Sequence, residues 1–256
     1  MRWYVTIALV GLLAYAVFLV AGFPAAVVLP RIMPAASGIQ AGEIEGSVWN
    51  GVARDVSVPP QGAFDRVEWR TRWGRLFLGE AALDVSILGD GVDAQGALAW
   101  DLLGQELRVA DLELSLEAGL LYRLGAVPFV LRGDIDGRVE RLAWSPGGVP
   151  LLNGAATWRG AALELPALLD LGEVQVDATT ERDRCLIVWQ GAPGAVGTQG
   201  RLTLEAPADY ALKMSLTPID EPDPGLQGVL RLLGRPDPDG SYRVEYAGSL
   251  AAATRP

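Results

Sequence analysis

Two pairs of acidic residues have a spacing that could support chemistry. Asp134 with Asp136, and Glu43 with Glu45, are each two residues apart, so in a strand both members of a pair would lie on one face. Two carboxylates on one face could bind calcium or serve as the acid and base of a glycosidase. A solvent-exposed strand face explains the spacing equally well and needs no ligand. We therefore predict no catalytic or metal-binding role for these four residues.

Other catalytic and metal-binding patterns are absent from the sequence. The chain of 256 residues has no histidine, so Ser-His-Asp and Cys-His catalysis cannot be assembled. No G-x-S-x-G, P-loop or G-x-G-x-x-G motif occurs, and the turn at Asp237–Gly240 lacks the remaining ligands of an EF-hand loop. Cys185 stands in an apolar stretch and is expected to be a buried core residue. The sequence thus predicts no catalytic, cofactor or metal site and no enzyme activity.

Basic and aromatic residues are most densely interleaved in one short segment. Its members are Arg66, Trp69, Arg70, Arg72, Trp73 and Arg75. One interpretation is a contact with a membrane surface or a partner. The other is a strand with its tryptophans turned inward and its arginines in water, and we favour this second interpretation.

An apolar segment near the N-terminus precedes these residues and predicts that the chain is attached to a membrane. Trp3–Phe23 is a run of about 21 residues without a charge, and a helix of that length, roughly 31 Å, would cross a bilayer. It is longer than a signal-peptide core, and its one A-x-A pattern, Ala14–Tyr15–Ala16, lies inside the run. We expect an uncleaved transmembrane anchor over 1–24.

Three prolines, Pro24, Pro30 and Pro34, are expected to end the anchor helix and begin an extended connector. This connector is predicted over 25–40. Only Arg2 and Arg31 flank the apolar run, so charge gives little guide to orientation. Because almost no chain precedes the run, the simpler topology leaves the N-terminus in the cytoplasm and translocates the body.

Composition limits what the body can be. The chain has 31 acidic and 21 basic residues and a formal net charge of −10, which argues against nucleic acid as a partner. A single cysteine excludes an internal disulfide. The 31 glycines and 17 prolines favour many short strands joined by tight turns.

Alternation with period two predicts strands through the body. It is clearest in Val109–Glu117, and it recurs around Val67–Trp73, Val174–Asp177, Leu202–Leu204 and Tyr242–Tyr246. Turn signals separate the strands at Gly89–Gly91, Ser145–Gly148, Pro222–Gly225 and Pro236–Gly240. Short helices are expected only at Glu117–Leu124 and Leu165–Leu171. The predicted fold is mainly β: a transmembrane helix followed by a curled, mostly antiparallel sheet over 41–256.

The body also contains a weak internal sequence similarity. Gly42–Val48 resembles Gly133–Val139, and Gly46–Gly51 resembles Gly154–Gly160 with one extra residue. Two similar halves, about 41–140 and 141–256, are one interpretation, and chance recurrence in a glycine-rich β protein is the other.

The order of motifs resembles the type II secretion system protein N family, also called general secretion pathway protein N, along essentially the whole chain. The anchor is followed by Gly46–Gly51, then Val67–Trp69 and Leu76–Glu80, and the chain closes with Gly240–Val244 and Gly248. The resemblance implies a single-pass inner-membrane protein of Gram-negative bacteria with a periplasmic β-rich body. It would work with other components of the apparatus that exports folded proteins across the outer membrane, without catalytic residues.

A broader resemblance gives an alternative. AsmA-like envelope proteins also combine an N-terminal anchor with glycine-punctuated amphipathic strands. Their curled sheets enclose a hydrophobic groove and are associated with phospholipid movement. This resemblance implies a periplasmic lipid-binding or lipid-transfer protein with phospholipid as its ligand, because a curled apolar face can pack on itself or hold acyl chains.

Overall fold

The computed structural model describes most of the body. The described residues are 22–32, 38–60, 62–76, 78–101, 104–124, 127, 130–145, 148–164, 168–181, 184–192, 194–205, 209–219, 227–228, 230 and 235–249. Residues 1–21, and with them nearly all of the predicted anchor, lie outside this description. Within it, no helix has the length and apolar character needed to cross a bilayer.

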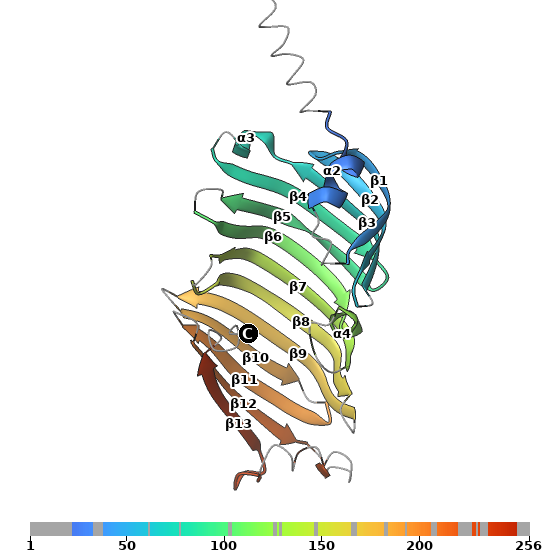
Figure 1. Ribbon diagram of the computed structural model, residues 1–256. Helices are drawn as coiled ribbons and strands as arrows, with labels where there is room; N and C mark the ends of the chain where they lie inside the picture. The colour runs from blue at the N-terminus through green and yellow to red at the C-terminus, as the bar shows by residue number, and fades with distance from the viewer. Residues whose placement is uncertain are drawn as a thin grey trace, which may run out of the picture.

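Thirteen strands form one antiparallel sheet in which each strand pairs with its neighbours in sequence (Figure 1). The strands are β1 (Gln40–Ser47), β2 (Asn50–Val58), β3 (Gly62–Thr71), β4 (Glu80–Gly89), β5 (Val92–Asp101), β6 (Glu106–Glu117), β7 (Val130–Trp144), β8 (Leu151–Glu164), β9 (Leu168–Glu181), β10 (Arg184–Ala192), β11 (Val196–Glu205), β12 (Asp209–Pro218) and β13 (Tyr242–Ser249). The helices are α2 (Ala25–Ile32), α3 (Trp73–Leu76) and α4 (Gly119–Arg123). β1 and β13 are the two edges, so the sheet is not closed. A mainly β, antiparallel fold is confirmed.

The alternating sequence gives the sheet two unlike faces, because side chains of successive residues in a strand point to opposite sides. In β6 the leucines and valine are partly buried, whereas Asp111, Glu113 and Ser115 are exposed. The register continues this across strands: Val109 lies opposite Leu98 of β5 and Leu142 of β7. We call these two sides the apolar face and the polar face.

Glycines on the apolar face make room for tryptophans of the neighbouring strand. Gly51 pairs with Trp69, and Gly200 pairs with Trp189. A Cβ at either glycine would overlap the indole ring of its partner. The Trp69 ring is held in place because its Nε1 donates a hydrogen bond to the carbonyl of Val48, 3.0 Å away. The glycine- and tryptophan-centred motifs are thus packing units of the sheet.

One end of the strands, which we call the capped end, is covered by short segments. There α4 follows β6, and its residue Leu120 is buried beside the equally buried Leu131 of β7. The adjoining Leu124 comes so close to Gly62 of β3 that a Cβ there would clash with it. Farther along the sheet, a cluster of buried residues closes the same end: Ala161, Leu169, Leu171, Val174, Val196, Leu216 and Leu230.

The opposite end, which we call the open end, contains the β1–β2, β3–β4, β5–β6 and β7–β8 connections. The chain enters the body here, because the Phe23 carbonyl accepts a hydrogen bond from the Val48 backbone N–H at 3.0 Å. Pro24 also forms a β-bridge with Ser47, the last residue of β1. In Figure 1, α3 marks the open end of β3 and β4, and α4 marks the capped end of β6 and β7.

Three sequence predictions about local structure were wrong. Residues 168–171, expected to be helical, belong to β9, because Leu169 and Leu171 share the buried face of a strand. Residues 25–32 of the expected extended connector form α2, which begins directly after Pro24, where a fixed φ and a missing N–H are tolerated. Trp73 does not share a strand face with Trp69, because β3 ends at Thr71.

The other local predictions have varied outcomes. A short helix within Glu117–Leu124 is confirmed, but α4 spans only Gly119–Arg123, and Glu117 is the last residue of β6. The turn at Gly89–Gly91 joins β4 to β5, while Pro222–Gly225 lies outside the described residues. The proposed division between halves falls inside β7, and the similarity of the halves stays a prediction.

Candidate interaction surfaces

The paired acids lie on the polar face, and three of the four contact arginines. Arg54 of β2 forms ion pairs with Glu43 at 3.0 Å and with Glu45 at 3.1 Å. Hydrogen bonds to Glu45 first, and then to Glu43, raise the pKa of Arg54 above its ordinary value. Asp136 pairs in the same way with Arg159 of β8. Charge pairing across strands thus accounts for Glu43, Glu45 and Asp136, while Asp134 is exposed on the same face as Asp136.

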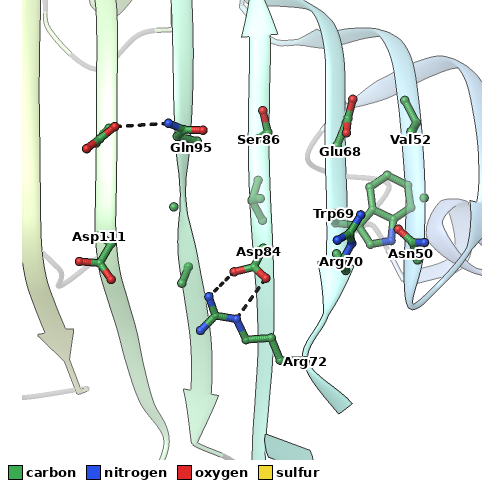
Figure 2. Close-up of a pocket in the computed structure, with 15 residues that line it drawn as sticks. Asn50, Val52, Glu68, Trp69, Arg70, Arg72, Asp84, Ser86, Gln95 and Asp111 are labelled. Atoms are coloured by element: carbon green, nitrogen blue, oxygen red, sulfur yellow. Dashed lines mark hydrogen bonds and ion pairs between the residues drawn. The ribbon is translucent and has the colours of Figure 1, made fainter. Parts of the chain in front are cut away.

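The basic-aromatic segment divides between a strand and a helix. Arg72 binds both carboxylate oxygens of Asp84, at 2.6 and 3.1 Å (Figure 2), and this hydrogen bonding raises the pKa of Arg72. Arg66 pairs with Glu68. Trp73, at the start of α3, packs on Trp49 with ring centroids 4.4 Å apart. The interpretation of arginines in water holds, whereas Trp73 stays exposed.

A shallow depression of about 490 Å³ runs across the polar face from β2 to β6. Figure 2 shows Glu68, Ser86 and Gln95 side by side on adjacent strands along it. Gln95 donates a hydrogen bond to Glu113 at 3.3 Å. The depression exists because small side chains lie between longer ones on an open sheet face. Of the charged groups that line it, Arg72 and Asp84 bind each other.

An ion-pair network centred on Glu80 lies at the open end. Glu80 accepts hydrogen bonds from Arg75 at 2.8 Å and Arg108 at 2.7 Å, and its side chain is only 15% exposed. Arg108 also binds Glu106 at 3.0 Å, and this contact, first among several, raises the pKa of Arg108. The network joins α3 to β4 and β6.

Cys185 and the Asp237–Gly240 turn are accounted for by burial and by hydrogen bonds within the chain. Cys185 is fully buried in β10, as its apolar neighbours predict, and burial raises the pKa of its thiol. Asp239 accepts hydrogen bonds from the Ser241 hydroxyl at 2.7 Å and backbone N–H at 3.1 Å, and these lower the pKa of Asp239. Among the described residues, no three His, Cys, Asp or Glu side chains are grouped so as to hold a metal ion.

Exposed apolar side chains line the open end from β3 to β8. We call this set the aromatic rim: Trp73, Leu78, Trp100, Trp144 and Leu151. Trp100 lies opposite Leu107, which lies opposite Trp144. Sequence reasoning missed Trp100 and Trp144. Each is at or next to the end of a strand that also carries charged residues, and only the strand order places both at one end of the sheet.

The chain is similar to proteins of the type II secretion system along most of its length. A family model described as "Type II secretion system (T2SS), protein N" matches residues 37–245. The type II secretion system protein N of Aeromonas hydrophila is 27% identical over 262 residues, which cover 98% of this chain and 100% of that protein. The protein of the same name from Vibrio cholerae serotype O1 is 25% identical over 232 residues, covering 89% of this chain and 91% of its own length. No solved structure matches significantly.

The matched residues include every described strand except the last four residues of β13 and exclude the predicted anchor. The family assignment therefore rests on the sheet itself, whose glycine–tryptophan packing units fall within the matched range. The resemblance seen in the sequence is confirmed: the chain belongs to the type II secretion system protein N family.

Proposed function

We propose that this protein is a non-enzymatic component of the type II secretion system, held in the inner membrane by residues 1–24. Its N-terminus would lie in the cytoplasm and its sheet in the periplasm, where it contacts other secretion components. The observation that carries the proposal is the family match over residues 37–245, together with relatives that align over nearly their full lengths.

The described sheet supports a role by contact. Three of the four acids singled out in the sequence, Glu43, Glu45 and Asp136, pair with arginines, and the one cysteine is buried. An open sheet with two unlike faces offers a large surface to partners, and exposed surfaces of this kind mark interaction sites.

Co-purification of the tagged full-length chain from membranes in mild detergent tests this function. Secretion components enriched with the tagged chain would support it, and an eluate without any of them would contradict it. Protease added to spheroplasts tests the topology separately, because a periplasmic body is digested while the inner membrane is intact and a cytoplasmic body is protected.

A lipid-binding function is a second candidate, favoured by the state of the apolar face. Side chains such as Leu98, Leu112 and Leu142 are only partly buried, and no second sheet covers them among the described residues. Acyl chains could cover such a surface, since removing apolar area from water stabilises a complex. Native mass spectrometry of the purified full-length chain should then detect bound phospholipid, and a lipid-free protein would exclude this candidate.

A further inference from the structure

We infer that the aromatic rim docks on the phospholipid bilayer, so that the open end of the sheet rests on the membrane surface with its strand ends toward the lipid. This inference rests on the proposed function in one respect, the anchoring of the apolar run Trp3–Phe23 in that bilayer. It assigns a role to residues that lie far from the run in sequence. It also differs from lipid binding within the apolar face, because the ligand is the membrane surface itself.

The point at which the chain enters the body gives the first argument. Phe23, the last residue of the apolar run, is exposed, and its carbonyl bonds directly to the Val48 N–H at 3.0 Å. Pro24 bridges to Ser47, and Ala25 is fully buried. No flexible linker therefore separates the end of the run from the open end. A bilayer that holds the run must therefore lie beside the open end of β1 and β2.

The chemistry of the rim gives the second argument. Tryptophan is enriched where a membrane meets water, because its ring is apolar while its N–H keeps a polar partner. Trp73, Trp100 and Trp144 are all exposed at the open end. By contrast, the other two tryptophans farther along the sheet, Trp158 and Trp189, are partly buried and donate hydrogen bonds within it. The exposed indoles of the described residues thus lie at the same end of the sheet as the point of chain entry.

The charges beside the rim show which lipid property it recognises. Arg72, Arg75 and Arg108 are each paired with carboxylates of Asp84, Glu80 and Glu106. Paired arginines leave little positive charge for anionic headgroups, and binding driven by such attraction would weaken with salt. The rim should therefore dock by insertion of apolar side chains, and zwitterionic phosphatidylcholine should suffice.

The capped end supplies matched controls within the same chain. Trp144 in the rim is 42% exposed and Tyr122 of α4 is 46% exposed. Leu151 in the rim is 43% exposed and Leu168, at the start of β9, is 55% exposed. Each pair combines similar side chains and similar exposure with opposite positions along the strands, so general stickiness of exposed apolar residues would affect both members equally.

Site-specific photo-crosslinking tests the inference. The full-length chain is reconstituted into phosphatidylcholine vesicles with p-benzoylphenylalanine at one of the four positions 122, 144, 151 or 168, and radiolabelled phosphatidylcholine is included. We expect several-fold more lipid adduct at 144 and 151 than at 122 and 168, unchanged by high salt. Equal yields at the two ends, or adducts only at the capped end, would overturn the inference.

Two further readouts separate the possible failures. Extraction with alkaline carbonate reports on the anchor alone: a chain that is released refutes anchoring, whereas a chain that stays in the vesicles without rim adducts refutes docking. In native membranes, crosslinks from 144 and 151 to a protein in place of lipid would assign the rim to a protein partner and would also overturn the inference. An unchanged urea midpoint for each substituted chain confirms that it is folded.

Discussion

The capped end and the open end of the sheet carry the same apolar face but cover it differently. At the capped end, Leu120 of α4 is buried, and Leu230 belongs to a buried cluster that includes Leu169 and Leu216. At the open end, from β3 to β8, the leucines and tryptophans of the aromatic rim are exposed, and the chain enters at the same end beside β1. A sheet that no second sheet covers among the described residues can thus be most stable at one end and leave the other end for contact.

Replacing a leucine by alanine should lower the free energy of unfolding much more at the capped end than at the open end, and this is the largest effect that we expect. Leu169→Ala empties a buried site in the capped cluster and should lower the free energy of unfolding by about 2–5 kcal/mol. Leu151→Ala removes an exposed side chain and should change it by only about 0.5 kcal/mol. Urea unfolding of the full-length chain in detergent measures both. Equal losses of unfolding free energy in the two variants would contradict the difference between the two ends.

Glycine substitution in β11 tests the packing units that both ends share. A Cβ at Gly200 would overlap the Trp189 ring, so Gly200→Ala should cost about 1–3 kcal/mol of unfolding free energy through overpacking. Gly197→Ala in the same strand is the control, because its Cβ would only touch the Thr217 carbonyl oxygen at 3.6 Å. Near-ultraviolet circular dichroism should report a moved indole in the first variant alone. A tolerated Gly200→Ala would refute the packing role.

The ion-pair network at the open end should contribute less than the capped core. Glu80→Gln weakens its hydrogen bonds to Arg75 and Arg108, both of which remain partly in water, and should cost about 1 kcal/mol. Glu113→Gln, on the exposed polar face, should cost less and serves as the comparison. Because the lost attraction is electrostatic, the difference between the two variants should shrink in high salt. A difference that grows with salt would contradict this account.

The smallest expected effect concerns Cys185, because its thiol should not be alkylated in the folded chain. It lies near the open end of β10 but is fully buried, and burial raises its thiol pKa by disfavouring the thiolate. Iodoacetamide at mildly alkaline pH should leave the native chain unmodified and alkylate it after unfolding in urea. Rapid labelling of the native chain would show that the exposed part of the open end extends beyond β8.

Sequence patterns predicted the strands better than their arrangement. Period-two alternation located β6, β11 and much of β3, because one face of each strand is apolar. It failed at residues 168–171, where a leucine-rich stretch without clear alternation fits a helix as well as a strand. The aromatic rim could not be predicted, because Trp100 and Trp144 come together only through the register of β5, β6 and β7.

The most direct test of the open-end account is the membrane depth of two nitroxide labels in the full-length chain. Leu151→Cys and Leu168→Cys would be labelled separately, since buried Cys185 should not react, and power saturation would compare collisions with oxygen and a water-soluble nickel complex in phosphatidylcholine vesicles. The account predicts that the label at 151 favours oxygen, as in lipid, and the label at 168 favours the nickel complex, as in water. Equal accessibility of both labels to the nickel complex would contradict it.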